Sequence, residues 1–343
     1  MSRLDIYRTA LLAADPAVSS DDLCAALGRE EFAFVDFIID HGLGPTWHER
    51  TGKEEFYASR MQAEALFVMQ EKALLDIDAA LTGAGIDYVV IKGSANRLLL
   101  YDNPAVRACY DIDLLVRPDD RVEAATALIQ SGFEALPESR AISRGLVLSR
   151  ASINIDLHWG LLREGRLKID PTVEMLGRRR RVGDIWVLSS DDTFFTLLVH
   201  PAFAKHLAGW DMGLHRVADL LAWIRTQEFD WSVVRAMLQA NGVGTAAWAT
   251  LRWAQLLAGA HAPSRMQDML TDVRPGGLRR AWLEHWLQND LSGRAATVHW
   301  VRLLGFTTFL HDTGGDALRA ALGRWRARRR SETDLDAFRQ LLD

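Results

Sequence analysis

Two different periodicities of apolar and polar residues divide the chain. Helical spacing prevails up to about residue 81 and again beyond residue 190, where the sequence is rich in Trp, Leu and Ala. Between these stretches, short apolar runs of strand character alternate with helical ones, starting where Gly83 and Gly85 close a long helix and "DYVVIKG" follows. The pattern predicts a core with a mixed sheet between a helical head and a helical tail.

The predicted regions are a head over residues 1–59, a core over 60–190 and a helical domain over 191–343. Within the core, two helices are predicted, at "SANRLLLY" and at "PDDRVEAATALIQSG". The strand candidates are "DYVVIKG", "CYDIDLLV", "FEAL", "GLVLS", "SINIDLHW" and "DIWVLS".

Composition leaves the partner open. The net charge of -5 gives no general electrostatic case for a nucleic-acid binder, although the arginine run at 178–181 and another near the end leave nucleic acid possible. The two cysteines, Cys24 and Cys109, are far apart and suggest neither a disulfide framework nor a zinc site. No apolar run approaches the roughly 20 residues of a membrane span, so a cytoplasmic location without membrane contact is expected.

Two aspartates stand one residue apart in "CYDIDLLV". Because alternate residues of a strand share a face, Asp111 and Asp113 project to the same side, away from Ile112 and Leu114. Neighbouring carboxylates raise each other's pKa unless a cation compensates them, and Mg²⁺, which prefers oxygen ligands, is the simplest compensation. A strand Asp is also often a structural ion-pair partner, so the pair alone is weak evidence.

The residues around this pair add the groups that a bound phosphate needs. Gly93 and Ser94 follow a strand and open a helix, where backbone amides and a hydroxyl can hold an anion, although such a pair is commonly only a helix cap. Lys92 and Arg107 are further candidate cations for a polyphosphate. In "SINIDLHW", Asp156 supplies the third carboxylate that a two-metal displacement requires, and it shares a strand face with Asn154 and His158.

The order of these motifs resembles the nucleotidyltransferases of the DNA polymerase β type, and most closely a bacterial group of uncharacterised nucleotidyltransferase-like proteins. The matching motifs are "IKGSANRLLLY", Arg107, "DIDLLV", "SGFEAL" and "IDLHW". The resemblance implies an α+β fold with a polymerase β-like core. It also implies that Gly93 and Ser94 hold the triphosphate, and that Asp111, Asp113 and Asp156 bind metal and catalyse.

On this basis the expected function is Mg²⁺-dependent transfer of a nucleoside monophosphate from a nucleoside triphosphate, with ATP as the expected donor and two metal ions. The acceptor is open: a small natural product, a peptide, a protein or an RNA end. Two alternatives stay open, a catalytically inactive nucleotide-binding or regulatory module and a toxin-type enzyme that modifies tRNA or protein.

The helical tail contains further candidates for closing over the nucleotide or the acceptor. Two of them, Lys205 and His206, are included in the predicted nucleotide-binding set. The others are Trp210, His215, Arg216 and Asp219.

Overall fold

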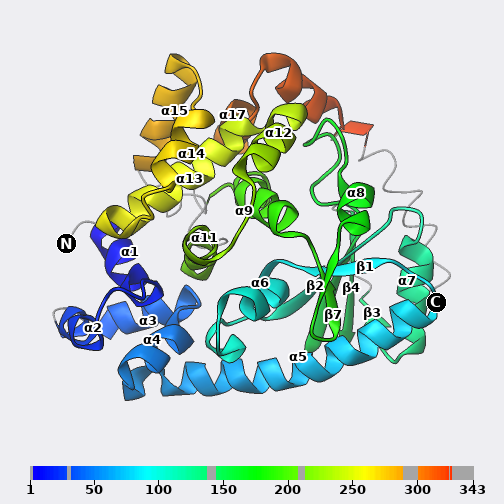
Figure 1. The fold of residues 1–343 in the computed structure, drawn as a ribbon, viewed down its shortest axis with the longest axis horizontal. Helices are drawn as coiled ribbons and strands as arrows, with labels where there is room; N and C mark the ends of the chain where they lie inside the picture. The colour runs from blue at the N-terminus through cyan, green and yellow to red at the C-terminus, as the bar shows by residue number, and fades with distance from the viewer. Residues whose placement is uncertain are drawn as a thin grey trace.

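The computed structural model describes residues 3–28, 32–136, 144–207, 213–288, 300–323 and 325–326. At its centre is a seven-stranded sheet with the order β3-β4-β5-β2-β1-β7-β6 (Figure 1). The strands are β1(Tyr88–Ile91), β2(Asp111–Val116), β3(Glu134–Ala135), β4(Gly145–Arg150), β5(Ile153–His158), β6(Arg180–Val182) and β7(Ile185–Val187).

The sheet is mixed, as predicted. Strand β2 runs antiparallel to β1 and parallel to β5, and β1 runs parallel to β7. The outer pairs, β3 with β4, β4 with β5 and β6 with β7, are antiparallel. Together with the helices on both faces, this confirms the predicted α+β class.

One strand was missed because its residues are arginines. Strand β6 begins inside the run at 178–181, which the sequence predicts as a solvated charged face. Three of these arginines form ion pairs with carboxylates elsewhere in the chain, at distances from 2.6 to 3.0 Å, and Arg178 and Arg181 are exposed, as predicted. The pairs are Arg178 with Asp192, Arg179 with Asp87 and Arg181 with Asp78.

Helices α5(Tyr57–Gly83) and α7(Arg121–Gln130) cover one face of the sheet; in Figure 1 they lie along the bottom and at the right. The buried side chains between this layer and the sheet include Ile112, Leu114 and Val116 of β2, which are inaccessible to solvent. These are the alternate positions of the strand, so the intervening residues face the other layer.

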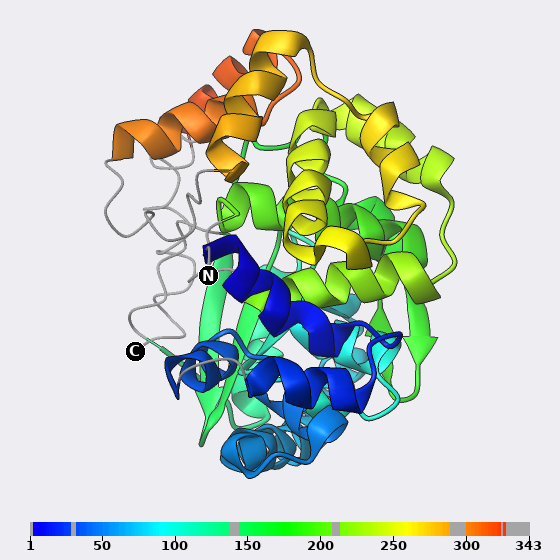
Figure 2. The same cartoon turned by 90° about the vertical axis from the view of Figure 1, so that its left-hand side faces the viewer.

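On the opposite face, α6(Lys92–Leu100) contacts β1 and β2. The buried residues of this face belong to one hydrophobic cluster with α9(Ser190–Ala204), α11(Leu214–Thr226) and α13(Gly244–Ala258). The N-terminal helices share this same core, and α1 contacts both α11 and α13 (Figures 1 and 2). Head and tail are therefore parts of one hydrophobic cluster, while the three regional boundaries stay a prediction. The N-terminal helices are α1(Arg3–Leu11), α2(Ser20–Leu27), α3(Phe32–Asp40) and α4(Gly44–Thr51).

The remaining elements complete the helical layers. None of the helices in the described ranges combines the length and apolar character that a bilayer span requires. The further α-helices are α8(Thr172–Gly177), α12(Trp231–Asn241), α14(Met266–Asp272), α15(Gly277–Gln288), α17(Trp300–Phe309) and a helix over 314–323. The short 3-10 helices are η1(Leu12–Ala14), η2(Glu54–Phe56), η3(Pro104–Val106) and η5(Gly259–His261).

Candidate functional site

The strand register brings the predicted carboxylates together. Strands β2 and β5 are neighbours and parallel, with Asp113 opposite Asp156 and Asp111 opposite Asn154. Because their apolar neighbours fill the layer against α5 and α7, the aspartates face the other side of the sheet. All three line one cavity of about 250 Å³.

A histidine that was not predicted as a site residue completes the closest group. The possible ligand atoms of Asp113, Asp156 and His158 all lie within 4.8 Å of one another. Asp111 lines the same cavity but is outside this group, so the predicted metal set of Asp111, Asp113 and Asp156 is not the one that the structure gathers most closely. His158 stands two residues after Asp156 on the same strand face, and that spacing in "IDLHW" was the available signal.

Lys92 supplies one positive charge at this group. Its Nζ lies 2.5 Å from Asp113 Oδ1 and 3.0 Å from His158 Nε2, which itself lies 2.9 Å from the same carboxylate oxygen. Burial alone would raise the pKa of Asp113, but Lys92 and His158 outweigh it and hold this pKa well below its ordinary value. Lys92 therefore acts as the counter-ion of Asp113.

The other two carboxylates are not compensated in this way. The pKa of Asp111 is raised by burial and then by the charges of Asp113 and Asp156. The pKa of Asp156 is raised by burial and then by the charge of Asp113. The three carboxylates and Lys92 together carry a net negative charge, and carboxylate oxygens suit Mg²⁺ or Mn²⁺, so this group of residues fits a divalent cation.

Cationic side chains from the loop after β5 and from the tail line the rest of the cavity. Lys205 is among them, whereas His206 is not a lining residue. Arg216 of α11 also lines the cavity, and its charge acts on Asp111. His200 is kept neutral, because burial and then the charge of Lys92 lower its pKa well below the ordinary value. The tail therefore contributes to the cavity, and it does so through Lys205 and Arg216 and not through His206.

Ser94 does not present an open hydroxyl to this cavity. Its side chain is fully buried, and its Oγ donates to the backbone carbonyl of Asp111 at 2.8 Å and lies 3.4 Å from Cys109 Sγ. The predicted contact between this hydroxyl and the triphosphate is therefore corrected. Ser94 instead holds the backbone of β2 at Asp111, the first residue of the strand.

Arg107, predicted as a phosphate-binding cation, is instead held inside the protein. Its Nη2 donates to Asp219 at 2.7 Å, its Nε donates to the same carboxylate, and its Nη1 donates to the carbonyl of Ala108 at 2.7 Å. Asp219 also accepts from Asn96 and Tyr101. Only 5% of the Arg107 side chain is exposed, so this pair joins α11 to the sheet.

Gly93 is required by the same packing. A Cβ on Gly93 would lie 2.6 Å from Arg107 Nη1 and 2.9 Å from Cys109 Sγ, closer than real contacts allow. Gly93→Ala is therefore expected to destabilise the protein by about 1–3 kcal/mol, the usual cost of overpacking. Urea denaturation measures this cost, with Gly83→Ala, whose Cβ meets nothing within 4 Å, as the control. Equal stability of both variants would contradict the contact.

His215 and Asp219, also predicted in the tail, do not line this cavity. His215 Nδ1 lies 3.1 Å from the carbonyl oxygen of His41, and burial lowers the pKa of His215 to about 3. This histidine joins α11 to the N-terminal head. Trp210 lies outside the described residues.

Two adjacent parallel strands of the mixed sheet direct Asp113 and Asp156 into one cavity with basic walls. This arrangement is that of a protein of the nucleotidyltransferase type. The model of the uncharacterised nucleotidyltransferase family matches residues 40–259, and the chain belongs to this family. A comparison with curated proteins finds no match. Family membership supports transfer of nucleoside monophosphates as the general chemistry.

Proposed function

We propose that the protein transfers a nucleoside monophosphate, with ATP as the donor and two Mg²⁺ ions, onto an acceptor and releases pyrophosphate. The observation that carries the proposal is the register of β2 and β5, which places Asp113 beside Asp156 at the floor of one cavity. A purely structural role would not require three carboxylates on a face where two have raised pKa values.

Asp113, Asp156 and His158 would hold the metal most closely, with Asp111 as a further ligand from the same wall. Bound divalent ions would stabilise the negative charge that builds up on the attacking and leaving oxygens. The chain's own contribution is to hold these ligands on rigid, hydrogen-bonded strands. Ser94, through its bond to the Asp111 carbonyl, adds to that rigidity.

Asp156 is proposed as the general base. Its carboxylate faces the cavity, where it can accept a proton from an acceptor hydroxyl. The acceptor hydroxyl gives its proton to Asp156 while its oxygen forms a bond to the α-phosphorus. The bond from that phosphorus to the bridging oxygen breaks, and pyrophosphate leaves with the electron pair.

Lys205 and Arg216 are proposed to bind the phosphate oxygens, since both line the cavity and carry positive charge. Lys92, which pairs with Asp113, lines the same cavity. At the start of α6, the backbone amides of Gly93 and Ser94 are proposed to contact a phosphate as well. This part of the predicted contact does not depend on the buried Ser94 hydroxyl.

Transfer of label separates this activity from other phosphate chemistry. With Mg²⁺ and ATP labelled at the α-phosphate, the protein is expected to form a labelled product with an extract of small molecules. ATP labelled at the γ-phosphate is expected to give no labelled product.

Asp156→Asn is expected to slow transfer by about 10²–10⁴-fold, because it removes the base.

Binding of ATP with Mg²⁺, measured by calorimetry, provides the control for Asp156→Asn, which keeps the shape of the side chain. A product labelled from the γ-phosphate would show a kinase and contradict the proposal. ATP binding without any release of pyrophosphate would favour the inactive binding module, for which the close Lys92–Asp113 pair is the supporting observation.

A further inference from the structure

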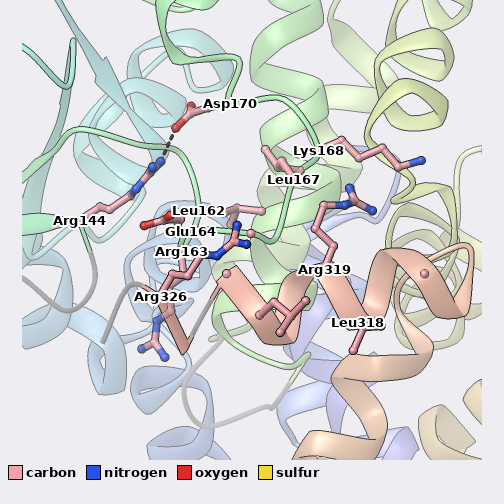
Figure 3. A pocket seen from close by; sticks show the side chains of 14 residues that line it. Arg144, Leu162, Arg163, Glu164, Leu167, Lys168, Asp170, Leu318, Arg319 and Arg326 are labelled. Carbon is pink, nitrogen blue, oxygen red and sulfur yellow. Dashed lines mark hydrogen bonds and ion pairs between the residues drawn. The ribbon is translucent and has the colours of Figure 1, made fainter. Parts of the chain in front are cut away.

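A second and larger cavity, of about 460 Å³, lies beside the carboxylate cavity (Figure 3). Its walls come from the segment over 162–170, from Arg144, from the helix over 314–323 and from Arg326. Leu162 and Arg163 line both cavities, so the two cavities are adjacent and share these side chains. A molecule bound in the larger cavity can therefore extend towards the aspartates.

The two walls are held together by direct backbone contact. A Cβ on Gly323 would lie 2.6 Å from the Cα of Gly165, and a Cβ on Gly165 would lie 2.8 Å from the Cα of Gly323. Only glycine at both positions allows the helix over 314–323 to approach the loop this closely. The cavity is thus a built feature with a defined shape.

The lining of this cavity is basic in a protein of net charge -5. Five basic and two acidic residues line it, which gives a net charge of +3. Arg144 pairs with Asp170, and both Lys168 and Arg319 pair with one carboxylate, that of Asp316. The two that remain are Arg163 and Arg326, both exposed and without an ion pair among the described residues.

Leucines supply the apolar part of the wall. Leu162 and Leu167 come from the loop, and Leu318 and Leu322 from the helix. The two helix leucines are 61% and 46% exposed, which is unusual for large apolar side chains at a cavity. The cavity therefore offers an apolar surface next to two unpaired guanidinium groups.

We propose that this cavity binds the acceptor, and that the acceptor is a small molecule with an apolar body and a carboxylate or phosphate group. The guanidinium groups of Arg163 and Arg326 hold the anion, and the leucines contact the body. The attacking hydroxyl then passes Leu162 and Arg163 to reach Asp156. This assignment rests on the proposed nucleotidyl transfer and names the class of its second substrate.

Three probes with one apolar group test the cavity without an active enzyme: 4-phenylbutyrate, phenyl phosphate and the cationic control 4-phenylbutylamine. Saturation-transfer NMR with the full chain is expected to detect binding of at least one anion and none of the amine. Which anion binds distinguishes carboxylate from phosphate. Arg326→Glu should weaken this binding at least about tenfold, a change of about 1.4 kcal/mol.

Arg274→Glu is the matched control, because it makes the same charge change at an exposed arginine that lines neither cavity. It should leave anion binding unchanged. Equal binding of the amine and the anions, or anion binding that Arg326→Glu leaves intact, would overturn the assignment.

Calorimetry with ATP and Mg²⁺ separates a failure of this inference from a failure of the proposed function. Arg326 lines only the larger cavity, so Arg326→Glu is expected to leave ATP binding within about twofold. If ATP binding weakens as much as probe binding, the cavity serves the nucleotide and the acceptor assignment is wrong, while nucleotidyl transfer stands. If the wild type transfers no α-label, the proposed function fails and the acceptor role fails with it.

Discussion

Replacement of Asp113 by Asn is expected to lower nucleotidyl transfer by at least about a thousandfold and to destabilise the protein as well. The activity falls because the side chain at the centre of the proposed metal group loses its charge. The stability falls because Lys92 and His158, whose side chains are only 14% and 17% exposed, lose their shared partner. For a pair this buried, the cost is about 3 kcal/mol.

Asp111→Asn is the control for the stability effect. Its folded-state pKa is raised, so above that pKa the charge of Asp111 costs stability, and the loss of this charge should leave the protein equally or slightly more stable near pH 7. Asp113 has the opposite sign: its contribution is present above the unfolded pKa and is lost as the pH falls through the depressed folded pKa. The urea midpoint of Asp113→Asn, measured without metal at pH 7, should be well below that of Asp111→Asn. Equal midpoints would contradict the counter-ion role of Lys92.

The second large effect concerns the pair of Arg107 with Asp219, whose side chains are only 5% and 1% exposed. Arg107→Met removes one partner and leaves a buried carboxylate, so the free energy of unfolding is expected to fall by about 3–5 kcal/mol. Replacing both partners, as in Arg107→Met/Asp219→Leu, should recover part of this loss, because no unpaired charge remains. Guanidinium denaturation of the single and double variants measures both values.

Arg235→Met is the matched control, since Arg235 pairs with Asp272 at 3.7 Å on the surface. That pair is expected to contribute no more than about 1 kcal/mol. If Arg107→Met is as stable as the wild type but no longer binds ATP with Mg²⁺, the phosphate-binding role first predicted for Arg107 would be restored.

The alternation of side chains along a strand explains why the carboxylates were predictable. Asp111 and Asp113 must share a face on any regular strand, and Asp156 lies on a second strand of the same apolar character. The partners of these residues were not predictable, because they come from tertiary contacts. Lys92 pairs with Asp113, whereas the sequence predicted Mg²⁺ as the compensating cation and Lys92 as a contact of the polyphosphate.

Arg107 and Ser94 show the same limit for the phosphate contacts. The local sequence places both next to the predicted site, and there a free arginine or a free hydroxyl would bind phosphate. Their actual partners are Asp219, more than a hundred residues later, and the carbonyl of Asp111. Strand β6 was missed for a related reason, since Arg181 of this strand is paired by Asp78 of α5, and Arg178 just before it by Asp192 of α9, and only the fold brings these carboxylates near.

The core shared by α1 and α13 sets an order of events during synthesis. Tyr7, Ala10 and Leu11 are buried in that core, and Arg8 Nε donates to the carbonyl of Leu256 at 3.0 Å. About 230 residues separate the end of α1 from the start of α13. At typical rates of translation, roughly 10 to 50 seconds pass before the ribosome delivers the helix that covers this apolar surface. The nascent head is therefore a natural client for chaperones that bind exposed apolar segments.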